Sequence, residues 1–167
     1  LSIFLDQIYA DILKDQFVEG KHTFDELVDQ YRHVYIKTWS NPSIQQILRN
    51  GGNWMIGDDH DFANNADDEK MAGKYRILLL AAQKAFEEYQ FQLMMDVNEN
   101  TQDFFYSKRI GNTGIYFLDV RVHRTFYFEQ KYPLFGRKQL EDFEVDFFFF
   151  EFFSFSFFFA KKFFKNL

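Results

Sequence analysis

The sequence predicts an α/β fold, in which short buried strands alternate with amphipathic helices. Two apolar runs, at residues 2–5 and 54–56, have the length of strands, and each leads within two residues into acidic side chains. Longer segments repeat apolar residues at the i, i+3, i+4 and i+7 spacing of a helix face. Because functional side chains in α/β folds commonly follow the carboxyl ends of strands, these acidic residues are the first candidates for a site.

The composition fits one globular domain and bears weakly on the kind of partner. The chain has 167 residues, 47% of them hydrophobic, and a formal net charge of -6. This charge argues against nucleic acid as a partner, because phosphate backbones bind basic surfaces. No apolar run reaches the ~20 residues of a membrane span. No cysteine is present, so a disulfide framework is excluded. Compartment and oligomeric state are not indicated.

The first predicted helix covers residues 24–38, after the strand at 2–5. Thr23 and Glu26 stand at the two positions of a capping box. Asn41–Ser43 ends this helix, and residues 43–49 begin a shorter one. The apolar face of the first helix consists of Phe24, Leu27, Val28, Tyr31, Val34 and Tyr35.

The second half of the chain predicts one long helix, a pair of strands and a last helix. The long helix is expected over residues 67–97. Strands are expected at 104–106 and 113–120, joined by a turn at Gly111–Asn112. A further helix begins within 134–143. The apolar stripe of the long helix consists of Tyr75, Leu78, Leu79, Ala82, Phe86, Tyr89 and Leu93.

The C-terminal end has an unusual composition. The chain contains 25 Phe, and nearly half of them follow residue 146. The run at 147–159 has neither helical nor strand periodicity, so residues 145–167 are predicted to be a disordered or non-native tail. The alternative is an aromatic membrane-surface anchor with a basic flank at Lys161, Lys162 and Lys165. The chain also opens on an apolar run without Met, and both ends are expected to be incomplete.

Two oxygen-rich segments follow the predicted strands. The first extends from Asp6 to Asp11, and the second from Asp58 to Asn65. Carboxylates and an imidazole brought together in this way suit divalent or trivalent metal ions. Two such ions would hold a phosphoryl group and generate hydroxide, and His60 would protonate the leaving oxygen. The alternatives are a helix cap or turn at Asp6 and a solvated acidic turn around His60.

These segments resemble a known family, the PhoD-like metallophosphatases. Leu5–Asp11 is similar to the family's Gly-Asp-Gln-Ile-Tyr-Ala-Asp block, and Trp54–Asp61 to its Asp-Asp-His-Asp/Glu block. Gly114–Arg121 resembles a later strand that ends in Leu-Asp-x-Arg, and Leu134–Gln139 the Leu-Gly-x-x-Gln that follows. The resemblance covers residues 1–144 in the family's order, with Leu5 in the place of the family's Gly.

The resemblance implies a role for each matching residue. Asp6 would bridge two metal ions, Tyr9 would be a phenolate ligand to a ferric ion, and Asp59 would bind the second metal. His60 would be the catalytic histidine. The residues expected to orient these ligands are Asp11, Asp58 and Asp61. Arg121 and Arg124 would face the phosphate or brace the loop, and bracing is the favoured interpretation.

The function implied by the resemblance is metal-dependent hydrolysis of small phosphate mono- or diesters. The expected cofactors are Fe³⁺ and Ca²⁺, with other divalent metals as alternatives. The expected fold is an incomplete metallophosphatase-type β-sandwich flanked by helices, over residues 1–144. The family's first ligand block would precede residue 1, and its last histidine-bearing blocks would follow residue 144. The chain is therefore expected to hold part of the site, and a catalytically inactive binding domain is the alternative.

Overall fold

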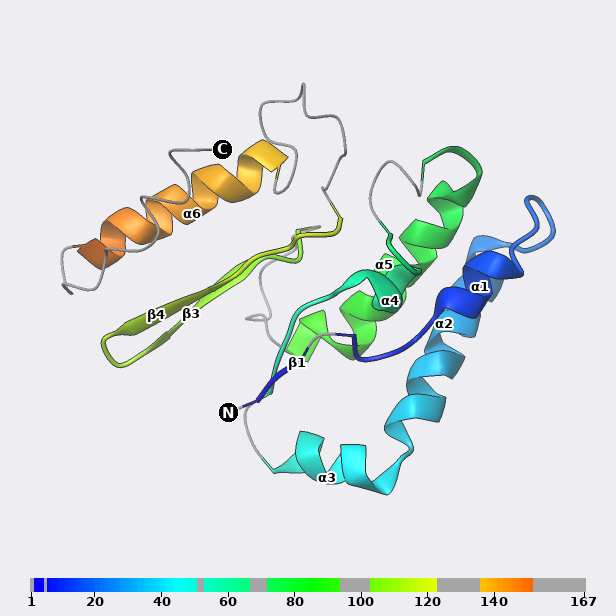
Figure 1. The fold of residues 1–167 in the computed structure, drawn as a ribbon, viewed down its shortest axis with the longest axis horizontal. Helices are drawn as coiled ribbons and strands as arrows, with labels where there is room; N and C mark the ends of the chain where they lie inside the picture. Colours follow the sequence, from blue (N-terminus) through cyan, green and yellow to red (C-terminus); the bar gives the residue numbers. More distant parts are fainter. Residues whose placement is uncertain are drawn as a thin grey trace.

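The computed structural model describes residues 2–4, 6–50, 53–66, 72–93, 103–122 and 136–151 (Figure 1). Its elements, in chain order, are β1 (Ser2–Phe4), α1 (Asp11–Asp15), α2 (Phe24–Trp39), α3 (Pro42–Arg49), β2 (Asn53–Met55), α4 (Asp59–Phe62), the 3₁₀ turn η1 (Gly73–Tyr75), α5 (Arg76–Tyr89), the 3₁₀ turn η2 (Phe91–Leu93), β3 (Tyr106–Ile110), β4 (Thr113–Phe117) and α6 (Gly136–Glu151). This mixture of helices, a parallel strand pair and an antiparallel hairpin confirms the broad α/β class.

Strands β1 and β2 pair in parallel, with Ser2 opposite Asn53 and Phe4 opposite Met55. Both strands lie within one residue of their predicted positions. Parallel strands need a long crossover connection, and here helices α1, α2 and α3 supply it. The pairing brings the carboxyl ends of the two strands to the same edge.

Helices α2 and α5 pack against each other and bury the main core beside the strand pair (Figure 1). The predicted capping box at the start of α2 is confirmed, because the Thr23 side chain accepts from the Glu26 N–H and the Glu26 carboxylate accepts from the Thr23 N–H. Phe24 was expected on the apolar face, but it is 39% exposed. The largest fully buried side chains of the core include Tyr31, Tyr35, Phe62, Phe86, Leu27, Leu78 and Leu79.

The long helix predicted over 67–97 is shorter in the structure. Gly73 has a positive φ of 59°, which an α-helix does not accommodate, and the regular helix begins at Arg76. It ends at Tyr89, after which η2 changes the direction of the side chains. Leu93, expected in the buried stripe, is 67% exposed for this reason. The predicted parts at 67–71 and 94–97 lie outside the described residues.

The predicted hairpin is present, with different strand limits. Gly111 and Asn112 form the predicted turn between β3 and β4. Phe104 and Phe105 are buried but precede the strand, which continues to Ile110 instead. β4 ends at Phe117. In Figure 1 the hairpin and α6 lie on the side of β1 away from α1 and α2.

The last helix, α6, is confirmed and is longer than expected. Its backbone continues past the predicted boundary at 144 to Glu151, so the first residues of the predicted tail are helical. Residues 152–167 lie outside the described residues, as do Leu5 and Arg124. Within the described ranges, none of the helices combines the length and the apolar character that a membrane span needs.

Candidate metal centre

The candidate site lies at the common edge where β1 and β2 end. Asp6 follows β1 after one residue, and Asp58 caps the one-turn helix α4 that follows β2. The backbone N–H of Ala10 donates to the carbonyl of His60 over 3.0 Å, so the two segments are joined directly. The two oxygen-rich segments therefore meet at this edge.

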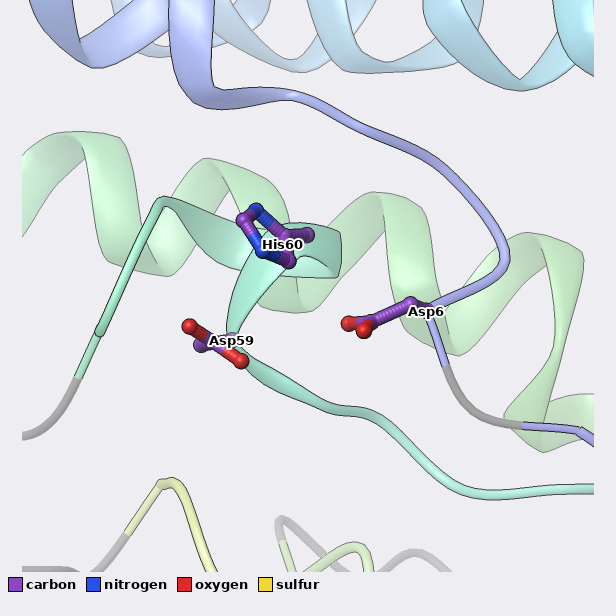
Figure 2. Close-up of side chains that lie close together, drawn as sticks. All are labelled: Asp6, Asp59 and His60. Carbon is purple, nitrogen blue, oxygen red and sulfur yellow. The ribbon is translucent and has the colours of Figure 1, made fainter.

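Asp6, Asp59 and His60 converge from these two segments. Each offers one possible ligand atom, and these atoms lie within 4.8 Å of one another (Figure 2). Figure 2 shows the two carboxylates and the imidazole around a common space, with Asp6 on its own loop. Two carboxylate oxygens and an imidazole nitrogen form a mixed donor set that suits divalent or trivalent metals.

Asp6 carries two signs of local strain. Its φ is 48°, in the left-handed region that few non-glycine residues adopt. Its Oδ1 is buried without a hydrogen-bond partner among the described residues. Burial raises the pKa of the Asp6 carboxyl, and the negative charges of Asp58 and Asp59 add to the rise. A cation beside Oδ1 would compensate for both the burial and the crowding of negative charge, so this residue fits a metal ligand.

Asp59 is held at both carboxylate oxygens. Oδ2 accepts from the Asn65 N–H at 2.6 Å, and Oδ1 lies 3.0 Å from Nη2 of Arg121. Burial acts to raise the pKa of Asp59, but the Asn65 N–H and the Arg121 charge outweigh it, so the pKa lies below its ordinary value. Asp59 is thus an oriented carboxylate that stays ionised.

His60 pairs with Asp11 from the end of the first segment. Nδ1 lies 2.8 Å from Oδ2 and 2.9 Å from Oδ1 of the Asp11 carboxylate. This hydrogen bond raises the pKa of the His60 imidazole. The Tyr9 ring lies over the imidazole with 4.6 Å between ring centroids, and 65% of the Tyr9 side chain is exposed. Tyr9 is therefore next to the cluster, with its ring against His60.

Asp61 is the buried centre of the hydrogen bonding around the site. Its Oδ1 accepts from Gln7 N–H at 3.1 Å and Ile8 N–H at 3.3 Å, and its Oδ2 accepts from Asp58 N–H at 3.0 Å. Burial raises its pKa to about 7, although the N–H donors around it act in the opposite direction. One carboxylate thus links the Asp6 segment to the start of α4, and its complete burial argues against a solvated acidic turn.

Several residues that support the site have no signal in the sequence. Gln90 donates to Asp61 at 3.1 Å and to the Tyr35 hydroxyl at 2.8 Å. The buried Tyr31 hydroxyl donates to the carbonyl of Phe62, at the end of α4. These contacts join residues 29 to 55 positions apart. The helical period places Tyr31 and Tyr35 in the core without identifying their partners, and it does not identify Gln90 at all. Arg121 contacts the cluster, whereas Arg124 lies outside the described residues.

Comparison with known proteins gives no relative. No protein-family model, no curated protein and no solved structure matches the chain.

Proposed function

We propose that the chain is part of a PhoD-like metallophosphatase, which hydrolyses phosphate mono- or diesters with the help of metal ions. The observation that supports this most strongly is the convergence of Asp6, Asp59 and His60 at the carboxyl edge of a parallel strand pair. The three residues come from the two motifs on which the resemblance depends. The metallophosphatase-type sandwich flanked by helices belongs to the same proposal.

Asp6 and Asp59 are the residues that would hold the metal, with Tyr9 as the phenolate that the resemblance adds. The resemblance favours Fe³⁺ and Ca²⁺, and the oxygen-rich donor set also suits other divalent ions. When bound, such ions supply positive charge for the phosphoryl oxygens and lower the pKa of a water molecule. The buried Oδ1 of Asp6, which has no hydrogen-bond partner among the described residues, is an atom that a cation would compensate.

His60 would act as the general acid for the leaving oxygen. Its Nδ1 is engaged by the Asp11 carboxylate, which fixes the ring and makes Nε2 the nitrogen that would give its proton to the substrate. The hydrogen bond with Asp11 raises the pKa of the His60 imidazole and so favours its protonated form. Asp11 would thus orient the imidazole and stabilise its protonated form.

A metal-binding domain without turnover is the second candidate. It is favoured by the exposure of Tyr9 and by the small size of the cluster, to which the described acidic and histidine residues contribute two carboxylates and one imidazole. Such a set binds a cation more readily than it builds a two-metal clamp.

The test compares the whole chain with two variants, using bis(p-nitrophenyl) phosphate as a chromogenic substrate in the presence of Fe³⁺ and Ca²⁺. Replacing the acid in His60→Ala is expected to lower kcat by about 10²–10⁴-fold. Asp59→Ala is expected to lose the dependence on added metal. His33→Ala, at an exposed position of α2, is the matched control and should keep the wild-type rate.

The outcomes separate the two candidates. Equal rates in the wild type and both variants would refute hydrolysis at this site. Metal binding that depends on Asp59, without measurable hydrolysis, would favour the binding domain. If neither metal binding nor hydrolysis is found, both candidates are wrong.

A further inference from the structure

We infer that Arg121 is a positioning residue for the metal site, which holds the carboxylate of Asp59 in the orientation that binds the cation. Arg121 comes from the loop after β4, on the hairpin side of the molecule, and reaches across to α4. The inference rests on the proposed function, because it concerns metal binding by Asp59. The inference goes beyond the proposed function, because it assigns the orientation of the Asp59 carboxylate to Arg121 and, through Arg121, to the hairpin and α6.

One edge of the Arg121 guanidinium contacts two neighbouring carboxylates. Nε donates to Oδ1 of Asp58, and Nη2 lies 3.0 Å from Oδ1 of Asp59. The Arg121 side chain is 18% exposed, and those of Asp58 and Asp59 are 22% and 11% exposed. Charges this well covered are screened less by solvent and salt than surface pairs. The planar fork of Arg is suited to holding two acceptors at once, which a Lys ammonium does less specifically.

This contact completes the support of Asp59. Asn65 N–H holds Oδ2, so Arg121 is the group that fixes the other oxygen and thereby the plane of the carboxylate. The same guanidinium lies between Asp58 and Asp59 and offsets the repulsion between their charges. Without it, the Asp59 carboxylate would be held at one oxygen, by the Asn65 N–H, and the Asp58 carboxylate by the Asp59 N–H, as far as the described residues show.

The backbone of Arg121 is itself fixed from α6. Oδ1 of Asp119 accepts from the N–H groups of Arg121 at 2.8 Å and Val122 at 3.0 Å. The side chain of Gln139, 1% exposed on α6, accepts from the Asp119 N–H at 2.7 Å and donates to the Asp119 carbonyl at 2.8 Å. A continuous set of buried and partly buried contacts therefore connects α6 to the carboxylate of Asp59.

Two other roles for Arg121 make opposite predictions. If it bound the phosphate group of a substrate instead, its removal would weaken substrate binding and leave the affinity for the metal alone unchanged. If it acted only as a competing positive charge, its removal would strengthen metal binding. Residues that orient a metal ligand typically change affinity by about 10–100-fold in the other direction when they are removed. The sign of the change in affinity therefore decides between positioning and competition.

The experiment measures the affinity of the whole chain for Mn²⁺ alone, by the loss of the free-ion electron paramagnetic resonance signal. Arg121→Ala is expected to weaken binding about 10–100-fold. Added methylguanidinium should restore part of this affinity, whereas methylammonium at the same concentration should not. Arg137→Ala, on the exposed face of α6, makes the same change in charge and should bind as the wild type does.

Two further variants keep the test independent of folding. Arg121→Lys retains the charge without the planar fork and should bind Mn²⁺ several-fold more weakly. Gln139→Glu retains the acceptor for the Asp119 N–H and loses the donor to its carbonyl, so it should weaken binding in the same direction. Circular dichroism is used to confirm that each variant is folded before its affinity is compared.

Unchanged or tighter binding in a folded Arg121→Ala variant would overturn the inference, and so would wild-type affinity in Arg121→Lys. Weakened binding that methylguanidinium does not restore would assign Arg121 to the support of the fold instead. Different results would refute the proposed function. These are a wild type that does not bind Mn²⁺, or an Asp59→Asn variant that binds Mn²⁺ as tightly as the wild type does. Loss of binding in Asp59→Asn with no change in Arg121→Ala would refute the positioning role alone.

Discussion

Replacing Tyr31 with Phe tests how α2 holds the one-turn helix on which the candidate site depends. The Tyr31 side chain is completely buried, and its hydroxyl donates to the carbonyl of Phe62 over 2.5 Å. Phe retains the ring and its packing, so the substitution removes this hydrogen bond with little change in shape. A buried carbonyl that loses its donor costs about 1–3 kcal/mol of folding free energy. For a chain of this size, that corresponds to a melting temperature lowered by roughly 2–12 °C.

Thermal unfolding followed by circular dichroism measures this change, with urea unfolding as a second estimate of the free energy. Tyr75→Phe is the matched control, because the Tyr75 ring packs beside Phe17 and is not fully buried. Its melting temperature should stay close to that of the wild type. Hydrogen exchange should also become faster at the Ala63 N–H, which donates to the Asp59 carbonyl within α4. Unchanged stability and exchange in Tyr31→Phe would refute the argument that this hydroxyl secures α4.

Three further predictions concern the pH response, a helix end and a close contact. Asp11→Asn should lower the pKa of His60, because it removes the charged acceptor that raises it; nuclear magnetic resonance titration of the ring protons measures this. In the wild type the His60–Asp11 pair stabilises the fold fully at pH values below the pKa of His60 in the unfolded chain, about 6.5. This contribution is lost as the pH rises through the higher pKa of His60 in the folded chain. Asp11→Asn should therefore lower the stability mainly at low pH. Thr23→Ala removes a confirmed capping box and should lower the free energy of urea unfolding by about 1 kcal/mol. Gly57→Ala would place a Cβ 3.0 Å from the Phe62 ring, and thermal unfolding should show a loss of about 1–3 kcal/mol.

Each of these predictions has a result that would contradict it. An unchanged His60 titration in Asp11→Asn would mean that the carboxylate does not control the imidazole. Wild-type stability in Thr23→Ala would show that the start of α2 does not depend on its cap. For Gly57→Ala, equal stability would require the Phe62 ring to move aside without loss of packing.

Local signals explain which parts of the fold could be predicted from the sequence. The limits of α2 follow from its apolar period and its capping box, both of which lie within the segment itself. Helices α1 and α4 are absent from the prediction, because four or five residues are too few to establish a helical period. The end of the long helix at Tyr89 also escapes the pattern, because apolar residues continue beyond it without the helical geometry.

The candidate site could be predicted in part for a different reason. Asp6, Asp59 and His60 follow apolar runs, and the parallel pairing of those runs is enough to bring them together. The exposure of Tyr9 and the contact of Arg121 with Asp59 depend on how distant segments pack, which a linear pattern does not encode.

The positive φ of Asp6 affects which residues selection would favour at this position. Glycine adopts a positive φ readily, whereas a residue with a Cβ pays about 1 kcal/mol there, somewhat less for Asp than for most others. Asp6→Gly would remove both this conformational cost and the buried oxygen that has no hydrogen-bond partner among the described residues. A chain selected for stability alone would therefore drift towards glycine at residue 6, and under the proposed function the aspartate would be kept for the metal ion that its carboxylate would hold.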